Sequence, residues 1–227
     1  VGQQFGYVTD GFFSQEDVEK YVINKGMEGG IPDHNFSPKA GDVKYRDLNG
    51  DYKIDDKDVA AIGYPKYPLL TGNMSLGFSW NGLDFSMVWS GAFKTSRLVS
   101  SFYRVPFDTT NNRALLSYMI KDAWTPEKGN SSTAPAISFG ASKANNYKDS
   151  DLWLRDASYV RLKNIELGYS FPKQIVKKMH LGTLRLSVSG YNLLTFDDMG
   201  FCDPESNPDG QAYPLIKVVN FGLKVGF

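Results

Sequence analysis

The sequence predicts an all-β fold, namely an antiparallel transmembrane β-barrel segment of about six strands with long loops that carry short helices. Three observations predict it. Apolar and polar residues alternate with a period of two over segments of the ~9–11 residues that a tilted strand needs to cross a bilayer. Aromatic residues make up 14% of the chain and there are 22 Gly, a mixture that favours strands and turns. No stretch reaches the ~18 apolar residues of a membrane helix, a test that alternating barrel strands escape.

The composition limits the function. Lys and Arg together number 25, as do Asp and Glu, so the formal net charge is zero. A nucleic-acid-binding protein typically shows a basic excess or stripe, and this sequence shows neither. The single cysteine, Cys202, has no partner for an internal disulfide and forms no CxxC metal-binding pair. The sequence starts at Val1 without Met or a signal peptide, which suggests a processed product or a fragment.

Residues 69–94 are predicted to form a β-hairpin. Asn81-Gly82 at its centre is the strongest two-residue hairpin signal, because both central positions of a type I′ turn need positive φ. On either side of that turn, apolar residues alternate with small or polar ones. The apolar set is Leu70, Gly72, Met74, Leu76, Phe78, Trp80, Leu83, Phe85, Met87, Trp89 and Phe93. The opposite set includes Asn73, Ser75, Asp84, Ser86 and Ser90.

Residues 159–196 are predicted to form a second hairpin. Its first strand alternates Ile165, Leu167, Tyr169 and Phe171 with Asn164, Glu166, Gly168 and Ser170. Because Val160 and Leu162 have the opposite parity, we expect a β-bulge near Lys163–Asn164 that returns them to the apolar face. Pro172 ends this strand, residues 172–180 are typical of a short helical turn, and the next strand begins at Leu184.

Residues 217–227 are predicted to form the final strand. Val219, Phe221, Leu223, Val225 and Phe227 alternate there with Asn220, Gly222, Lys224 and Gly226. A lysine that faced lipid at the middle of a bilayer would cost ~2–4 kcal/mol, so we expect Lys224 to point into the lumen. We expect segment 219–227 to be a transmembrane strand that closes a barrel.

The connections between the predicted strands alternate between short and long. Asn81-Gly82 and residues 172–182 are short, whereas residues 12–68, 95–158 and 197–217 form long loops. Outer-membrane barrels have short periplasmic turns and long extracellular loops. About six strands, the first around Gln3–Gly11, are too few for closure, since single-chain barrels start at about eight. We therefore expect the chain to be the C-terminal portion of a larger barrel.

Two helices are predicted within the long loops. In loop 12–68, the segment Ser14-Gln15-Glu16-Asp17 resembles a capping box, and Val18, Tyr21 and Val22 follow at helical spacing. This pattern predicts a helix over residues 14–24. A second helix is expected around Arg113–Ala123 in loop 95–158.

The sharpest candidate site is segment 47–58, which resembles a calcium-binding loop of the EF-hand type. The predicted ligands are the side chains of Asp47, Asn49 and Asp51, the carbonyl of Lys53, Asp55 directly or through water, and Asp58 as the bidentate closing ligand. Tyr52 stands at the sixth position, where such a loop calls for Gly to make a sharp turn. The alternative is a solvated acidic loop whose Asn-Gly and Asp residues only form turns.

The sequence offers little for catalysis, and we expect no enzyme. The only histidines, His34 and His180, lack the context of a nucleophile, so a catalytic triad is not indicated. The carboxylate pairs Asp197-Asp198 and Asp55-Asp56 are interpreted as solvated loop residues. Loop aromatic residues are interpreted either as packing among the loops or as stacking surfaces for sugar rings or a partner protein; they are Phe102, Tyr103, Phe107, Trp124 and Tyr147.

Six short motifs in this order resemble the C-terminal end of the SusC-like (SusC/RagA) family of TonB-dependent outer-membrane transporters. Residues 5–13 resemble the family's GYxxDGIF segment, and residues 41–51 resemble its GDIKYKDxNGD loop. Residues 124–127 match a WTPE element, and residues 158–165 resemble a SYLRLKNI strand. Residues 191–195 resemble QNLLT, and residues 200–205 resemble GFDPE with Cys202 interrupting the motif. A terminal Phe is also shared.

The resemblance implies a function. Such proteins form a barrel of about 22 strands with a plug inside. They import glycans or peptides across the outer membrane, energised by the TonB complex, with a SusD-like lipoprotein as an extracellular lid. The plug and the TonB-contacting segment would precede Val1, so contact with TonB would run through that missing N-terminal part. Residues expected to face the lumen or plug include Asn73, Ser75, Asp84, Ser86, Glu166, Arg185 and Lys224, while the apolar set faces outer-membrane lipid.

Two other classes stay open at the level of sequence. One is a soluble secreted calcium-binding β-sandwich, such as a carbohydrate-binding module, whose core-facing strands would also alternate. Solubility without detergent distinguishes it. The other is a structural or adhesive surface barrel without a transport role, which an upstream plug domain would exclude.

Overall fold

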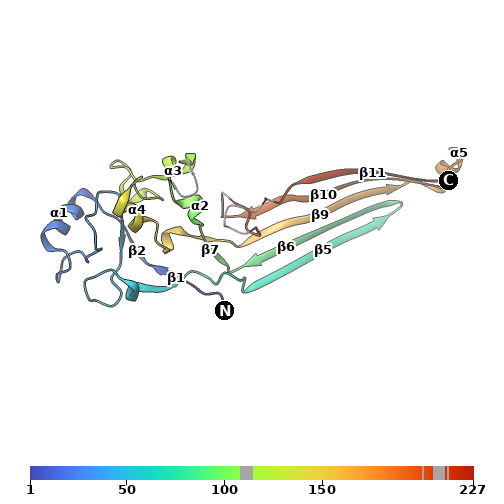
Figure 1. The fold of residues 1–227 in the computed structure, drawn as a ribbon. Coiled ribbons are helices and arrows are strands. Elements are labelled where there is room, and N and C mark those ends of the chain that lie inside the picture. The colour runs from blue at the N-terminus through green and yellow to red at the C-terminus, as the bar shows by residue number, and fades with distance from the viewer. Residues whose placement is uncertain (108–114, 201, 207–212, 214) are drawn as a thin grey trace. The chain divides into compact units, whose positions relative to one another are not determined.

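A computed structural model describes the chain except for residues 108–114, 201, 207–212 and 214. The described residues divide into two units. Of the described residues, we call those in 67–95, 156–206 and 213–227 the sheet unit, and those in 1–66 and 96–155 the loop unit. The ribbon of both is drawn in Figure 1.

The sheet unit is built on one antiparallel sheet of five strands in the order β11-β10-β9-β6-β5 (Figure 1). The strands are β5 (Leu70–Trp80), β6 (Leu83–Phe93), β9 (Tyr159–Ser170), β10 (Thr183–Asp197) and β11 (Val218–Gly226). Both predicted hairpins and the predicted final strand are present with nearly the expected bounds. The sheet is open, since β5 and β11 each pair on one side only among the described residues.

The turns of the two hairpins follow local sequence. Asn81 and Gly82 have φ of 49° and 88°, which confirms the predicted type I′ geometry between β5 and β6. A Cβ on Gly82 would stand 2.5 Å from the carbonyl oxygen of Ser170, so only glycine fits there. Helix α5 (Lys173–Lys178) follows Pro172 and joins β9 to β10, which confirms the predicted helical turn.

The predicted β-bulge lies in β9. Val88 of β6 pairs with Asn164, whereas the next residue, Trp89, pairs with Leu162, so Lys163 is an extra residue in β9. The register of β9 against β10 shifts at the same point. The bulge returns Leu162 to the apolar side of the sheet, as the parity of the sequence required.

The segment around Gln3–Gly11, predicted as a first barrel strand, does not join the five-stranded sheet. It forms β1 (Gln4–Tyr7), which pairs with β4 (Val59–Ile62), and β2 (Thr9–Phe12), which pairs with β3 (Val43–Tyr45). The large sheet therefore has five strands rather than about six. The error arose because pairing partners far apart in sequence decide whether a short alternating segment joins a large sheet or a small one.

The rest of the loop unit consists of short elements. Helix α1 (Gln15–Asn24) begins with the predicted capping box, in which the Ser14 side chain accepts from Asp17 N and Asp17 accepts from Ser14 N. Of the second predicted helix, residues 113–114 lie outside the described residues, and α3 (Ser117–Asp122) forms the remainder. The other elements are β7 (Ser96–Leu98), β8 (Leu154–Asp156), α2 (Ser101–Arg104), α4 (Gly140–Asn146) and the 3-10 turns η1 (Asp56–Asp58), η3 (Gly129–Ser131) and η4 (Asp151–Trp153).

Within the part of the chain that the structure describes, no helix has the length and apolar character needed to cross a membrane.

The loop unit has a hydrophobic core of its own, made mostly of residues from β1 to β3. Tyr7, Phe12, Val43, Tyr45 and Ile54 form this cluster, with Trp124 and Leu152 packed against it. Tyr45 and Val43 are at most 1% exposed. Ile54, the eighth residue of segment 47–58, is 2% exposed, so its side chain anchors that segment to the core.

Candidate functional site

One face of the five-stranded sheet is continuously apolar. The register places apolar residues opposite one another across all five strands, for example Met74 with Trp89, Phe85 with Leu167 and Leu184 with Val225. These side chains stay accessible: Phe221 is 86% exposed and Leu223 66% exposed. Soluble domains rarely expose an apolar surface of this extent, which marks a surface for contact with lipid or protein.

The opposite face of the sheet is polar. It holds every residue predicted to face a lumen: Asn73, Ser75, Asp84, Ser86, Glu166, Arg185 and Lys224. The sorting is strict enough that Lys224 pairs with Arg185 on this face while its neighbours Leu223 and Val225 lie on the other. The orientation predicted for Lys224 relative to the apolar face is therefore correct.

Three charged residues meet on the polar face near the short turns. Arg185 of β10 reaches across β9 to Asp84 of β6, with Nη2 at 2.7 Å from Oδ2, and lies 3.0 Å from Oε1 of Glu166. Gly168 lies between them, and a Cβ there would collide with the Arg185 guanidinium. Because Gly168 has no side chain, Arg185 can reach across β9 to Asp84. All three side chains remain about one-third exposed.

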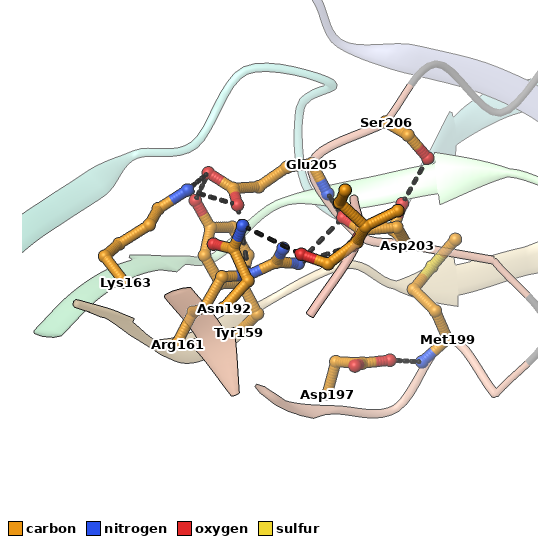
Figure 2. A network of polar contacts seen from close by, with 10 residues as sticks. Tyr159, Arg161, Lys163, Asn192, Asp197, Met199, Asp203, Glu205 and Ser206 are labelled. Atoms are coloured by element: carbon orange, nitrogen blue, oxygen red, sulfur yellow. Dashed lines mark hydrogen bonds and ion pairs between the residues drawn. The ribbon is translucent and has the colours of Figure 1, made fainter. Parts of the chain in front are cut away.

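A second ion-pair network lies at the other end of the same face (Figure 2). The Arg161 side chain of β9 is 1% exposed, and its Nη2 donates to both carboxylate oxygens of Asp203 at 2.7 and 2.8 Å. Its Nε stands 3.1 Å from Oε2 of Glu205 but is not aligned for a hydrogen bond. Arg161 is thus a buried charge with two carboxylate partners, the condition under which a charge is tolerated away from water.

Glu205 is held by two further residues of β9. Lys163 Nζ lies 2.7 and 2.8 Å from the two oxygens of Glu205, and the hydroxyl of Tyr159 donates to Oε1 at 2.7 Å. Asp203 shapes the turn that presents Glu205, because its Oδ1 accepts from Glu205 N at 2.9 Å. The network joins two of the motifs in the sequence, residues 158–165 and 200–205. Reasoning from sequence missed this pairing, although the two basic residues at 161 and 163 and the two acidic residues at 203 and 205 share the same spacing of two.

Segment 47–58 is a series of turns closed by side-chain acceptors. Asp47 accepts from the N–H groups of Gly50 and Tyr52, both at 2.7 Å, and Asn49 Oδ1 accepts from Asp51 N. Tyr52 adopts φ of 61°, so the sharp turn that normally calls for Gly is made by a tyrosine. The presence of Tyr52 at this position therefore does not prevent the turn.

The acidic side chains of segment 47–58 mainly serve the backbone. Asp58 is fully buried, and its two oxygens accept from Leu48 N and Asp55 N at 2.8 and 2.9 Å. Asp55 in turn accepts from Lys57 N. A hydrogen bond from the Asn49 amide lowers the pKa of Asp51, so that carboxylate stays ionised. Among the described residues, no three or more His, Cys, Asp or Glu side chains form a group that could hold a metal ion. Calcium binding here stays a prediction.

His34 is buried in the loop unit and is a structural residue. Its Nδ1 donates to the Pro32 carbonyl at 2.7 Å and its Nε2 accepts from Tyr45 N at 3.0 Å, an arrangement that requires the neutral ring. Burial lowers the pKa of His34 to about 4. Both ring nitrogens are occupied, so His34 has no free nitrogen with which to act as a base.

A buried polar network explains the motif at residues 41–51. Asp42, 1% exposed, accepts from Ser142 Oγ at 2.7 Å and from Asn146 Nδ2 at 2.8 Å. Asn146 also accepts from Val43 N at 2.8 Å. The motif therefore ties β3 to helix α4, about a hundred residues later in the chain. Asp42 therefore serves packing rather than ligand binding.

The sequence relatives of the chain are TonB-dependent receptors. The chain is 28% identical to TonB-dependent receptor P3 of Formosa agariphila over 98% of its own length and 22% of that protein. It is 27% identical to TonB-dependent receptor P26 of the same organism, over 82% of the chain. More particularly, it is 25% identical to TonB-dependent receptor SusC of Bacteroides thetaiotaomicron over 98% of the chain. The chain spans about a fifth of the length of the curated relatives that it matches.

Solved structures agree at the level of the fold. Structures of the RagAB peptide importer in its open-open state and of the RagAB peptide transporter match 99% of the chain with TM-scores of 0.66 and 0.67 at 18% identity. No protein-family model matches the chain. The resemblance to the SusC/RagA-like TonB-dependent transporters that the six motifs indicated is confirmed by these relatives.

Proposed function

We propose that this chain forms part of the barrel wall of an outer-membrane nutrient importer. The observation that carries the proposal is the division of the five-stranded sheet into a continuous, exposed apolar face and a face with charged side chains. A membrane strand needs this division, because lipid accepts only the first face and an aqueous lumen accepts the second. The open edges of β5 and β11 would pair with further strands of the barrel, since an unpaired edge is not tolerated in lipid.

The import would be energised by the TonB complex and would use a SusD-like surface lipoprotein. Similarity to SusC and to the RagAB peptide importer supports both partners. The cargo class proposed is a glycan or a peptide, because the relatives include both SusC and a peptide importer. No step of this function requires an enzyme, and the named relatives are receptors and importers.

A charge placed on either face of β5 in the parent protein tests the proposal. Leu76→Arg puts a cation on the apolar face, where it costs ~2–4 kcal/mol if that face meets lipid. Ser75→Arg is the matched control, because the neighbouring side chain lies on the polar face. We expect the first variant to be depleted from the outer-membrane fraction and the second to accumulate normally. Equal accumulation of both, or a parent protein that stays soluble without detergent, would contradict the proposal.

The alternative, a soluble calcium-binding β-sandwich, requires a second layer over the apolar face. Within the sheet unit, the described residues leave Leu76 47% and Phe78 54% exposed, which favours a face covered by lipid. Uptake distinguishes transport from a purely structural barrel. Cells that lack the parent gene should lose uptake of the cognate glycan or peptide while retaining growth on its monomers.

We also propose that segment 47–58 binds calcium. The support is the spacing of the candidate ligands, together with the sharp turn at Tyr52, the sixth position, which such a loop needs. Calorimetric titration of the purified parent protein should give heat on addition of calcium. Asp47→Asn removes a charge and keeps only one of the two oxygens that accept from Gly50 N and Tyr52 N, and should weaken that heat. An absence of heat at about millimolar calcium, the weakest class of natural site, would end this idea.

A further inference from the structure

The two ion-pair networks on the polar face of the sheet differ in their access to water. The Arg185 side chain is 29% exposed, whereas the Arg161 side chain is 1% exposed. Beside Arg161, the buried Oγ of Ser90 and Oδ1 of Asn164 are shut off from solvent and have no hydrogen-bond partner among the described residues. The polar face is therefore open near the short turns and covered at the level of Arg161.

The cover includes residues Cys202–Ser206, which we call the strap (Figure 2). Pro204 within it is buried, and Met199 just before it is 2% exposed. The strap has its own turn, in which Ser206 N and Oγ both donate to the Asp203 carbonyl. Its acidic side chains, Asp203 and Glu205, both point toward β9, where they meet Arg161 and Lys163 (Figure 2).

The bulge in β9 supplies both cations to this cover. Arg161 lies on the polar face opposite Ser90, and Lys163 is the extra residue that the bulge inserts. In a regular strand, residues two positions apart share a face, so Arg161, Lys163 and Ile165 would all lie on the polar face. The extra residue moves Ile165 to the apolar face. The bulge thus lets one strand present two basic residues toward the strap and then resume its apolar alternation.

We propose that Arg161 and Lys163 are positioning residues that hold the strap against the polar face, so that the strap narrows the lumen and limits the size of what enters. The narrowing rests on the proposed function, because it requires the polar face to line a barrel. The attachment of the strap does not, because the ion pairs that hold it, from Arg161 and Lys163 to Asp203 and Glu205, lie within the sheet unit. The strap follows β10 on the side away from the short turns, which places it toward the extracellular mouth.

Cys202 gives a direct probe of the strap. In the parent protein on intact cells, with any other cysteine replaced, the rate of Cys202 labelling is measured with a small and with a bulky membrane-impermeant maleimide. We expect the wild type to react with the small reagent and to resist the bulky one. Arg161→Ala should raise the rate with both reagents by about tenfold or more, because a buried carboxylate loses its partner. The labelling rates of Arg161→Lys should lie between those of the wild type and those of Arg161→Ala.

The matched control is Arg185→Ala, which breaks the other ion-pair network on the same face and should leave both rates unchanged. Glu205→Gln is a milder second variant should Arg161→Ala fail to accumulate, and it should raise the rates less. Unchanged labelling in a correctly inserted Arg161→Ala or Glu205→Gln protein would refute the attachment. A wild type that reacts equally with both reagents would refute the narrowing. A parent protein absent from the outer membrane would refute the proposed function alone, since labelling of the purified protein still tests the attachment.

Discussion

The sheet unit and the loop unit bury opposite kinds of side chain. In the sheet unit, Phe221 and Leu223 are exposed while Arg161 is buried. In the loop unit, Phe13 and Tyr45 are buried, as in an ordinary soluble domain. Under the proposed function, this difference reflects two solvents. The sheet is held by its hydrogen-bonded ladder and would have lipid over its apolar face, whereas the loop unit excludes water with a core of its own.

The largest effect that sharpens this comparison is the truncation of a phenylalanine in each unit. Phe13→Ala removes a fully buried ring that packs edge-on against Tyr21 and His34, and should cost ~3–5 kcal/mol. Phe221→Ala removes an 86% exposed ring and should leave the loop unit unaffected. Hydrogen exchange of the amides of α1 and β3 in the parent protein measures both. Equal loss of protection in the two variants would break the comparison.

The next effect is a pH dependence confined to the loop unit. The pKa of His34 is lowered to about 4 by burial, against an ordinary value near 6.5. Between these values the unfolded segment binds a proton that the folded one does not. The contribution of His34 to the free energy of unfolding is therefore fully present above about pH 6.5. It is lost as the pH drops toward about 4, and the total loss is about 3 kcal/mol.

Local unfolding around α1, measured by hydrogen exchange and corrected for intrinsic rates, should show this window. His34→Gln should lose it. The turn of β5 and β6, which contains no histidine, serves as the internal control. A matching acid sensitivity in that hairpin would assign the effect to another group.

A smaller effect distinguishes the sheet unit, whose register depends on its turn. Gly82→Ala places a Cβ 2.5 Å from the Ser170 carbonyl at a φ of 88°, and should destabilise the hairpin by about 2 kcal/mol. Gly72→Ala is the matched control, because a Cβ there meets nothing within 4 Å. Thermal stability of the purified parent protein compares them. Equal melting temperatures would show that the turn does not limit the sheet.

The smallest effect concerns the cap of α1. Ser14→Ala removes the acceptor for Asp17 N and should destabilise the helix by about 1 kcal/mol, whereas Ser14→Asp should preserve the cap. Amide exchange in the first turn of α1 measures the change, and protection equal to the wild type in Ser14→Ala would contradict it.

The sequence predicted most of the sheet unit because its signals are local. The alternation in β5 and β6, the Asn81-Gly82 turn and the parity change at Lys163 each lie within one element or between neighbours. The same reasoning placed the Gln3–Gly11 segment in the wrong sheet, because its partners β3 and β4 come tens of residues later in the chain. Candidate ligands of calcium could be named from spacing, but their use as acceptors for Leu48 N and Asp55 N could not.

By itself, the sequence determined which residues face together, because the side chains of a strand alternate regardless of what the strand packs against. It also determined the type I′ turn, since Asn-Gly tolerates positive φ. Only the tertiary structure decided that Arg161 is buried by carboxylates 42 positions away or more, and that His34 is a neutral core residue. Such pairings depend on which distant segments the fold brings into contact, and the spacing of residues along the chain does not specify those contacts.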